Sequence, residues 1–184
     1  LLAGGRIEVI RGDGAAAIGE VARRPHLNWA KATPSHLELL VRQLTPGHAL
    51  RTLVVGGEAF PTGLAQRLTE ALPGVAIYNE YGPTEAVVGC MIHRFDPHDE
   101  HRNEASVPIG VPMPGVTLGV FDHAGREVPP RVAGELWIAH SGLTAGYLDQ
   151  PELDAERFVD LTNVTDLTDL TDDTDLTDDT DLTD

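Results

Sequence analysis

The stretch RTLVVGGEAFPTGLAQRLTEALPGVAIYNEYGPTE, residues 51–85, contains two apolar runs separated by a segment with a helical period. Leu53–Val55 predicts a short buried strand, and Val75–Tyr78 predicts a second one. The segment between them is predicted to be a helix whose apolar face carries Leu64, Leu68 and Leu72. A strand-helix-strand unit with loops at both strand ends indicates an α/β fold.

A further helix is predicted before this unit. Its apolar residues follow the spacing i, i+3, i+4, i+7 and are Leu37, Leu40, Val41 and Leu44. Thr33 and Pro34 precede them and supply an N-cap and a first-turn proline. These signals together predict a helix that begins near Pro34.

The chain after Cys90 is predicted to change in character. His93–Asn103 is rich in His and acidic residues and is expected to be a loop that leads into a second, β-rich subdomain. In that subdomain, Leu118–Phe121 and Glu135–Ile138 are predicted strands, with Asp122–Gly125 as a turn between them. A short helix is expected within Asp149–Val159.

The last segment is a Thr/Asp/Leu repeat. From Thr165 the sequence repeats Thr-Asp-Leu or Thr-Asp-Asp to its end, so we assign residues 1–161 to one domain and residues 162–184 to a low-complexity tail. The tail has no aromatic residue and little apolar surface, so disorder is expected. A calcium-binding repeat fits less well, because the period of three and the lack of Gly match no such loop. A frame error or misassembly is the preferred origin.

Composition excludes several classes of function. The 184 residues are 41% hydrophobic, as in a globular protein, and 13 basic residues face 29 acidic ones for a net charge of −16. Phosphate binding needs clustered Lys and Arg, so a nucleic-acid partner is not expected. The single Cys90 allows no intramolecular disulfide, and no apolar run approaches the ~20 residues of a membrane span, so the expected location is cytoplasmic. Because the chain begins without Met and its first residues continue a sequence pattern rather than open one, it is expected to be an internal fragment.

The residues Tyr81–Glu85 combine chemical groups that suit a nucleotide. An aromatic ring, a hydroxyl and a carboxylate follow a predicted strand and a Gly-Pro turn, and they could stack on a base, bond a phosphate and hold a hard cation. The alternative is a surface turn with a capping Thr and a capping-box acid. From these residues alone the turn is the better interpretation.

A family resemblance reverses that preference. Asn79–Glu85 matches, residue for residue, the Asn-x-Tyr-Gly-Pro-Thr-Glu motif of amino-acid adenylation domains of non-ribosomal peptide synthetases, and the resemblance covers residues 1–161. Later segments resemble the family in the same order: Pro108–Gly110, Gly134–Ile138, Gly142–Leu143, Gly146–Leu148, Pro151–Leu153 and Glu156–Phe158. Two positions depart from the pattern, His140 for Gly and Ala145 for Arg, and His140 would be strained if a positive φ is needed there.

The resemblance implies part of the large lobe of an adenylate-forming enzyme, which activates a carboxylate with Mg²⁺ and ATP and passes it to a thiol. It implies that Asn79 bonds the adenine amino group, that Tyr81 stacks on adenine beside Gly82, and that Thr84 contacts phosphate while Glu85 ligates Mg²⁺. The opposite wall of the adenine site would be Gly57, Glu58 and Ala59. For Gly56 and Gly57, an ordinary tight turn is the alternative without the downstream motif.

The same resemblance places a substrate pocket at set offsets from the motifs: Lys31, Val54, Gly56, Glu80, Val88 and Gly89. This set resembles that of asparagine-activating domains. A carboxamide is both donor and acceptor, so Glu80 would accept and Lys31 would donate. Aspartate would be repelled by Glu80 and leucine would leave both groups unpaired, whereas glutamine stays an alternative substrate. In the alternative without a substrate pocket, Lys31 and Glu80 are a solvated surface pair.

The resemblance also implies partners and missing parts. The partners would be the phosphopantetheine of a carrier domain, a condensation domain and, as in some members, a small helper protein. The phosphate loop and the Asp that receives the substrate ammonium are expected before Leu1. The ribose-binding segment is expected soon after Phe158, followed by a lobe with the catalytic Lys, so the isolated chain is not expected to catalyse. An acyl-CoA or aryl-acid ligase, or a catalytically inert truncated product, are the competing interpretations.

Overall fold

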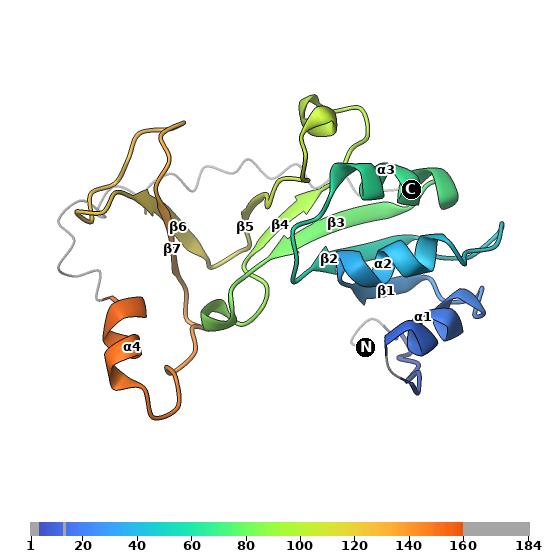
Figure 1. Ribbon diagram of the computed structural model, residues 1–184, viewed down its shortest axis with the longest axis horizontal. Coiled ribbons are helices and arrows are strands. Elements are labelled where there is room, and N and C mark those ends of the chain that lie inside the picture. Colours follow the sequence, from blue (N-terminus) through green and yellow to red (C-terminus); the bar gives the residue numbers. More distant parts are fainter. Residues whose placement is uncertain (1–3, 13, 160–184) are drawn as a thin grey trace. The chain divides into compact units, whose positions relative to one another are not determined.

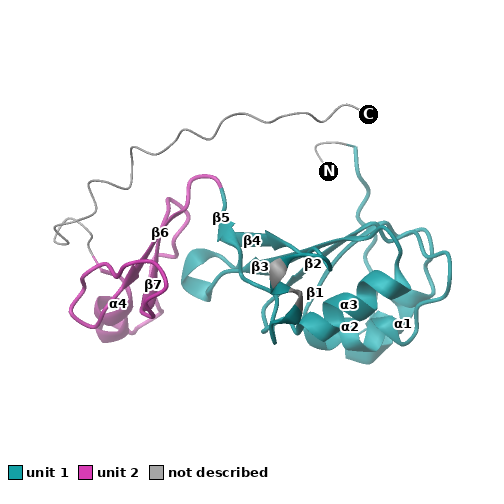
Figure 2. Cartoon of the chain, turned by 90° about the horizontal axis from the view of Figure 1, so that it is seen from above, with its two compact units in different colours: residues 1–113 teal, residues 114–184 magenta. Residues whose placement is uncertain are grey.

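The computed structural model describes residues 4–12 and 14–159, which form two compact units with a division between Met113 and Pro114 (Figure 2). The predicted domain 1–161 spans this division and stays a prediction. The repeat at residues 162–184, with its predicted disorder, lies outside the described residues. The chain is mixed α/β, as predicted from the sequence.

The first unit is built on a five-stranded sheet with helices (Figure 1). Its elements are α1 (Gly14–Ala22), β1 (Trp29–Ala32), α2 (Pro34–Val41), β2 (Thr52–Gly56), α3 (Thr62–Ala71), β3 (Ala76–Tyr81), the 3₁₀ helix η1 (Thr84–Ala86), β4 (Met91–Arg94), the 3₁₀ helix η2 (Glu100–Asn103) and β5 (Val111–Pro112). The sheet order is β1-β2-β3-β4-β5. The strands β1, β2 and β3 are parallel, and β4 and β5 add antiparallel pairs.

The three α-helices of this unit lie on one face of the sheet (Figure 2). The predicted N-cap of α2 is confirmed, because the side chain of Thr33 accepts a hydrogen bond from the backbone of His36 and Pro34 opens the helix. Leu53, Leu64 and Leu68 are at most 1% exposed and belong to one apolar core between helices and sheet. Helix α3 and strand β3 thus complete the predicted strand-helix-strand unit.

Three elements of this unit differ from the sequence-based predictions. The loop predicted for His93–Asn103 is wrong at both ends, since β4 includes His93 and Arg94 and η2 closes the segment, capped by the side chain of Asp99. β4 is a strand because it pairs with β3, and its four residues, Met91–Arg94, are too few to show a strand period of their own. The elements α1 and β1 were not predicted at all.

The second unit is a β-hairpin followed by a helix. β6 (Thr117–Phe121) pairs antiparallel with β7 (Glu135–Ala139), and α4 (Pro151–Arg157) follows, which confirms both predicted strands and the predicted helix. The turn at Asp122 is fixed by its carboxylate, which accepts hydrogen bonds from the backbone of Ala124 and Arg126. The bonds from Arg126 lower the pKa of Asp122 to about 2.

His140 is the position in this unit at which strain was expected if its φ were positive. Its φ is not positive, so that strain is absent.

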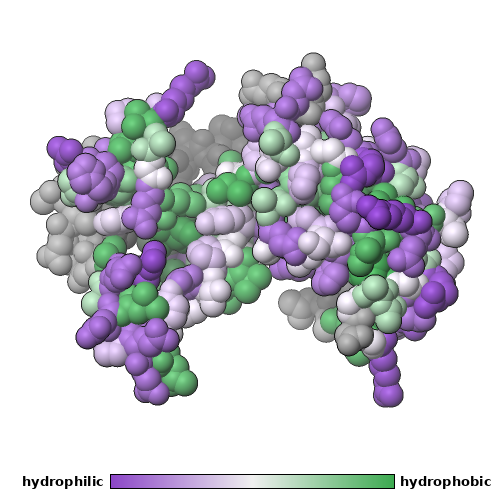
Figure 3. All heavy atoms as spheres, in the orientation of Figure 1, coloured by the Kyte–Doolittle hydropathy of each residue, from purple (hydrophilic) through white to green (hydrophobic). Residues whose placement is uncertain are grey.

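Figure 3 shows exposed apolar residues interspersed with hydrophilic ones on the face it presents. No helix among the described residues combines the length and the apolar character needed to cross a membrane.

Candidate functional site

The alternation of strand residues divides the predicted site between the two faces of the sheet. Leu53, Val55 and Ile77 point toward the helices and are at most 1% exposed. Because neighbouring residues of a strand point to opposite faces, the intervening positions lie on the face that carries no α-helix of residues 4–113. Those positions include Lys31, Val54, Gly56 and Glu80. Four of the six predicted substrate residues therefore share one face of the sheet.

The structure brings Lys31 and Glu80 into direct contact. The Nζ of Lys31 donates a hydrogen bond to Oε2 of Glu80, although β2 separates their two strands. The side chain of Glu80 is 15% exposed and that of Lys31 is 42% exposed. Lys31 is paired in register with Val54 of β2, and Glu80 is paired with Gly56 of β2. The side chains of Lys31 and Glu80 therefore meet over β2. The two charged residues therefore form one ion pair, in which Glu80 is partly buried and Lys31 is exposed.

The loop after β3 folds back against Glu80. A Cβ at Gly89 would lie 2.8 Å from Cδ of Glu80, and a Cβ at Gly82 would lie 2.6 Å from the carbonyl carbon of Val88. Side chains at these glycines would displace the loop or the carboxylate. Gly56 is equally constrained, since a Cβ there would lie 2.7 Å from the carbonyl oxygen of Glu80. Glycines thus permit the close contacts that hold the carboxylate in place.

The same loop holds two β-branched residues in an unfavourable backbone conformation. Val87 and Val88 have φ angles of 57° and 75°, and their exposures are 57% and 58%. Left-handed conformations at such residues cost about 1–3 kcal/mol each and persist only where the surroundings enforce them. Hydrogen bonds from both backbone N–H groups to Thr84 and Pro83 enforce them here. The predicted pocket residue Val88 therefore lies exposed on a strained loop.

Asn79 lies on the other face from Glu80 and is 4% exposed. Its Nδ2 donates hydrogen bonds to the carbonyl oxygens of Val107 at 3.1 Å and Pro108 at 2.9 Å. Both amide hydrogens are used, so Oδ1 is the part of this side chain suited to a ligand, and it can accept a bond from a donor such as an adenine amino group. The neighbouring Tyr81 is partly buried, and its carbonyl oxygen accepts a bond from the N–H of Cys90.

Thr84 and Glu85 lie in η1, directly after the Gly-Pro turn, with Thr84 exposed and Glu85 partly buried. Among the described residues, no group of three or more His, Cys, Asp or Glu side chains is arranged to hold a metal ion. Mg²⁺ that arrives with a nucleotide needs only one or two carboxylates, because phosphates and waters supply the other ligands. The carboxylate of Glu85 fits that requirement.

Glu58 makes a contact that the sequence analysis missed. Its Oε2 accepts hydrogen bonds from the backbone N–H of Ser35 at 3.1 Å and from Oγ of Ser35 at 2.6 Å. The side-chain bond from Ser35 is the main reason why the pKa of Glu58 is lowered, followed by the backbone bond. The preceding Gly57 has a φ of +85°, which favours glycine, and turns the chain toward α2. The sequence signal that could have indicated this contact was the absence of an acidic residue in the first turn of α2, where a negative charge is favourable.

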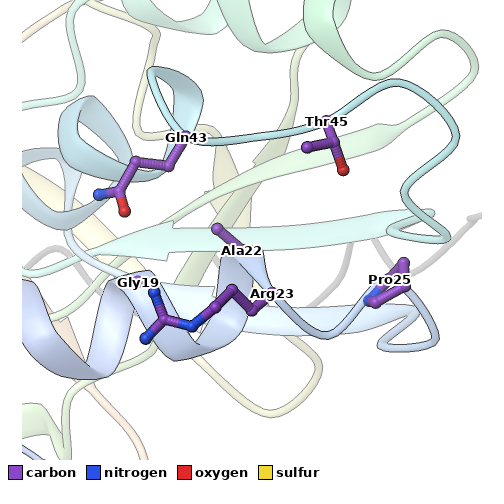
Figure 4. A pocket seen from close by; sticks show the side chains of 6 residues that line it. All are labelled: Gly19, Ala22, Arg23, Pro25, Gln43 and Thr45. Carbon is purple, nitrogen blue, oxygen red and sulfur yellow. The ribbon is translucent and has the colours of Figure 1, made fainter.

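One pocket lies away from these residues. Figure 4 shows it between α1 and the segment that follows α2, lined by Gly19, Ala22, Arg23, Pro25, Gln43 and Thr45. Its one charged residue, Arg23, forms an ion pair with Glu20. No predicted site residue lines it.

Comparisons with known proteins agree with the motif. The family described as AMP-binding enzyme matches residues 1–148. Bacitracin synthase 3 from Bacillus licheniformis is 42% identical over 162 residues, which are 86% of this chain and 2% of that protein. The chain thus spans a small part of the length of the curated relatives that it matches.

Solved structures give the same result. The non-ribosomal peptide synthetase FmoA3 matches with a TM-score of 0.72 and 30% identity over 84% of this chain and 17% of that chain, and forms bound to AMPPNP and to α-methyl-L-serine-AMP also match. PA1221, a protein with adenylation and PCP domains, matches with a TM-score of 0.62 and 28% identity over 78% of this chain and 28% of that chain. The chain therefore belongs to the AMP-binding enzyme family and corresponds to part of the adenylation domain of a non-ribosomal peptide synthetase.

Proposed function

We propose that the adenylation domain containing this chain activates L-asparagine with ATP. A carboxylate oxygen of asparagine bonds to the α-phosphorus, the bond from that phosphorus to the bridging oxygen breaks, and asparaginyl adenylate and pyrophosphate form. The observation that carries this proposal is the contact between Lys31 and Glu80 on the sheet face opposite the apolar core, with Glu80 inside the motif Asn79–Glu85. Positioning and charge neutralisation are the main catalytic requirements of such a transfer.

Each residue of the motif has a proposed role in holding the nucleotide. Oδ1 of Asn79 accepts a hydrogen bond from the adenine amino group, and the ring of Tyr81 stacks on the base. The backbone of Gly57, Glu58 and Ala59 forms the opposite wall, while Gly82 allows the chain to turn toward the phosphates. The hydroxyl of Thr84 donates to a phosphate oxygen and Glu85 ligates Mg²⁺. The bound ion supplies neutralisation of the charge that develops on the phosphates.

Selectivity for asparagine follows from the Lys31–Glu80 pair. The carboxamide inserts between the two groups, so that its NH₂ donates to Glu80 and its oxygen accepts from Lys31. Aspartate brings a second carboxylate against Glu80, which costs several kcal/mol by order of magnitude. Because Lys31 and Glu80 are bonded to each other, leucine does not leave them unpaired, as the sequence suggested. It is rejected because it removes water from both charges and supplies no hydrogen bond in return.

The rest of the proposed pocket lies around this pair. Val54 and Gly56 form its floor on β2, and Val88 and Gly89 close it from the loop after β3. Glutamine is one methylene longer, and such a difference is worth only about 1–3 kcal/mol in an apolar pocket, so glutamine is the competitor that this pocket rejects least.

The activated amino acid requires an acceptor. We propose that it passes to the phosphopantetheine thiol of a carrier domain and then to a condensation domain of the same synthetase. Carrier domains occur beside adenylation domains in the relative PA1221, which supports this assignment. A small helper protein, of the kind that some adenylation domains need, is a further proposed partner.

Amino-acid-dependent exchange of pyrophosphate into ATP tests the proposal, measured with the complete adenylation domain that contains this chain. Asparagine is expected to give the highest rate among the twenty amino acids. Glu80→Gln is expected to reduce discrimination against aspartate, whereas Glu70→Gln, an exposed carboxylate on α3, is the matched control and leaves it unchanged. A preference of the unmodified domain for aspartate or for an apolar amino acid would overturn the asparagine assignment.

A further inference from the structure

Glu80 has different neighbours on its two sides in the sheet. On the side of β2, its register partner is Gly56, which has no side chain, and Lys31 reaches Glu80 across this gap. On the side of β4, its register partner is Ile92. The carboxylate is thus open toward β2 and bordered by an aliphatic side chain toward β4.

Ile92 lies on the same face of the sheet as Glu80. Residues directly opposite each other in an antiparallel pair point to the same face, and their Cβ atoms are about 4.5–5.5 Å apart. The side chain of Ile92 is half-buried, and that of Glu80 is 15% exposed. Ile92 therefore covers the flank of Glu80 that faces away from Lys31.

The backbone holds Ile92 firmly in this place. β4 lies between β3 and β5, and Ile92 is paired with Glu80 on one side and with Val111 on the other. Gly110 packs so closely that a Cβ there would lie 2.0 Å from the carbonyl oxygen of Ile92. Isoleucine is branched at Cβ, which restricts its χ1 angle. Ile92 is therefore a rigid wall beside the carboxylate.

This wall limits where the carboxylate of Glu80 can go. Gly89 already lies so close that a Cβ there would be 2.8 Å from Cδ of Glu80. A rotation toward β4 would place the charge against Ile92, and burying a charge without a bonding partner is unfavourable. The favoured position is therefore the one toward β2, where Nζ of Lys31 donates a hydrogen bond to the carboxylate.

We propose that Ile92 is a positioning residue for substrate specificity, which confines the carboxylate of Glu80 to the side of Lys31. This inference rests on the proposed function and adds a residue to its pocket. Aspartate is rejected only while Glu80 stays in the pocket, because only then do two carboxylates meet. If Glu80 turns aside, Lys31 is left to pair with aspartate. An apolar neighbour also keeps water from Glu80, which strengthens the repulsion.

The position of Glu80 is tested first, in crystal structures of the complete adenylation domain without substrate. In Ile92→Ala, the carboxylate of Glu80 is expected to occupy a second position over residue 92, away from Nζ of Lys31. In the unmodified domain, only the position beside Lys31 is expected. An unchanged carboxylate in Ile92→Ala would overturn the inference, whatever amino acid the domain prefers.

Pyrophosphate exchange tests the effect on specificity. Ile92→Ala is expected to raise kcat/KM for aspartate about tenfold, to change that for asparagine by less than about threefold and to leave the KM for ATP within about twofold. A gain with aspartate is a result that damage to the fold does not produce. Val111→Ala is the matched control, because Val111 is the next residue of the same row, is 66% exposed, and should change none of these values. Equal losses with both amino acids would make Ile92 merely structural and overturn the inference.

A second pair of variants decides the question even if Ile92→Ala does not fold. Valine and threonine have nearly the same shape, but the hydroxyl of threonine can donate a hydrogen bond to a carboxylate. Ile92→Thr is expected to draw Glu80 away from Lys31 and to raise kcat/KM for aspartate about fivefold, whereas Ile92→Val should stay within about twofold of the unmodified domain. Equal activity of these two variants with aspartate would contradict the confinement of Glu80.

These outcomes separate the two proposals. If the unmodified domain does not prefer asparagine, the proposed function fails, and the crystal structures still decide whether Ile92 confines Glu80. If asparagine is preferred, and neither Ile92→Ala nor Ile92→Thr moves the carboxylate or raises the activity with aspartate, only the inference about Ile92 fails.

Discussion

The two faces of the sheet in the first unit use the same strands for different purposes. On the helix face, Leu53, Val55 and Ile77 are at most 1% exposed and contribute to a continuous apolar core. On the opposite face, Lys31 of β1 and Glu80 of β3 form a charged pair. The strand period of two therefore separates stability from recognition without separating them in sequence. Substitutions at adjacent positions should have effects of different kinds.

The largest expected effect is on the helix face. Leu53→Ala should lower the free energy of unfolding by about 2–5 kcal/mol, because a fully buried side chain leaves a cavity in the core. Urea denaturation followed by circular dichroism measures the change. Val54→Ala, the next residue on the same strand, is the control and should cost less than half as much. Equal losses at both positions would refute the division between faces.

The second effect concerns Asn79, the buried polar residue of the helix face. Asn79→Ala should cost about 1–3 kcal/mol, since the carbonyl oxygens of Val107 and Pro108 lose their donor. Asn79→Asp keeps the shape but removes both N–H donors and should be no better. A stable Asn79→Asp protein in urea denaturation would show that these bonds contribute little.

The third effect is small in stability and large in recognition. Lys31→Met should change the free energy of unfolding by less than about 1 kcal/mol, since pairs with an exposed partner contribute little. In the complete domain, the same substitution should abolish the preference for asparagine in pyrophosphate exchange. A loss of stability as large as that of Leu53→Ala would instead show that the Lys31–Glu80 pair stabilises the fold, and that the two faces of the sheet do not differ in this respect.

The smallest effect is the pH dependence of the contact between Glu58 and Ser35. The folded-state pKa of Glu58 is lowered by Ser35, so its contribution is present above the unfolded pKa of about 4.3 and is lost as the pH falls through the folded value. Thermal unfolding of the unmodified chain and of Glu58→Gln should differ by a constant amount at neutral pH, and the two curves should converge below pH 4. A constant difference down to pH 3 would contradict this assignment.

The predictable parts of the fold were those with a clear local period. The helix with Leu37 and Leu40 and the strands at Leu53–Val55 and Glu135–Ile138 were confirmed because their apolar residues follow one period and their ends carry Pro or Gly. β4 was missed because it forms through pairing with β3. α1 was missed because it contains two glycines, and Ile18 and Val21 are its only large apolar residues.

The site was predictable where a motif fixed it and unpredictable where contacts fixed it. The sequence indicated that Lys31 and Glu80 act together, but only the sheet register shows that they meet above β2. The contact of Glu58 with Ser35 joins residues 23 positions apart, and no sequence motif indicates it. The positive φ angles of Val87 and Val88 contradict their residue type, so propensity could not reveal them.

The contact between Gly89 and the carboxylate of Glu80 also constrains how relatives with other substrates can evolve. A Cβ at position 89 would lie 2.8 Å from Cδ of Glu80, so a larger residue there becomes tolerable only after Glu80 has been replaced by a shorter one. A chain with both a side chain at 89 and Glu80 must move the Glu80 carboxylate away from its present place beside Lys31. Among homologous sequences, the residue types at these two positions should vary together, with large residues at 89 confined to chains that lack a long acid at 80.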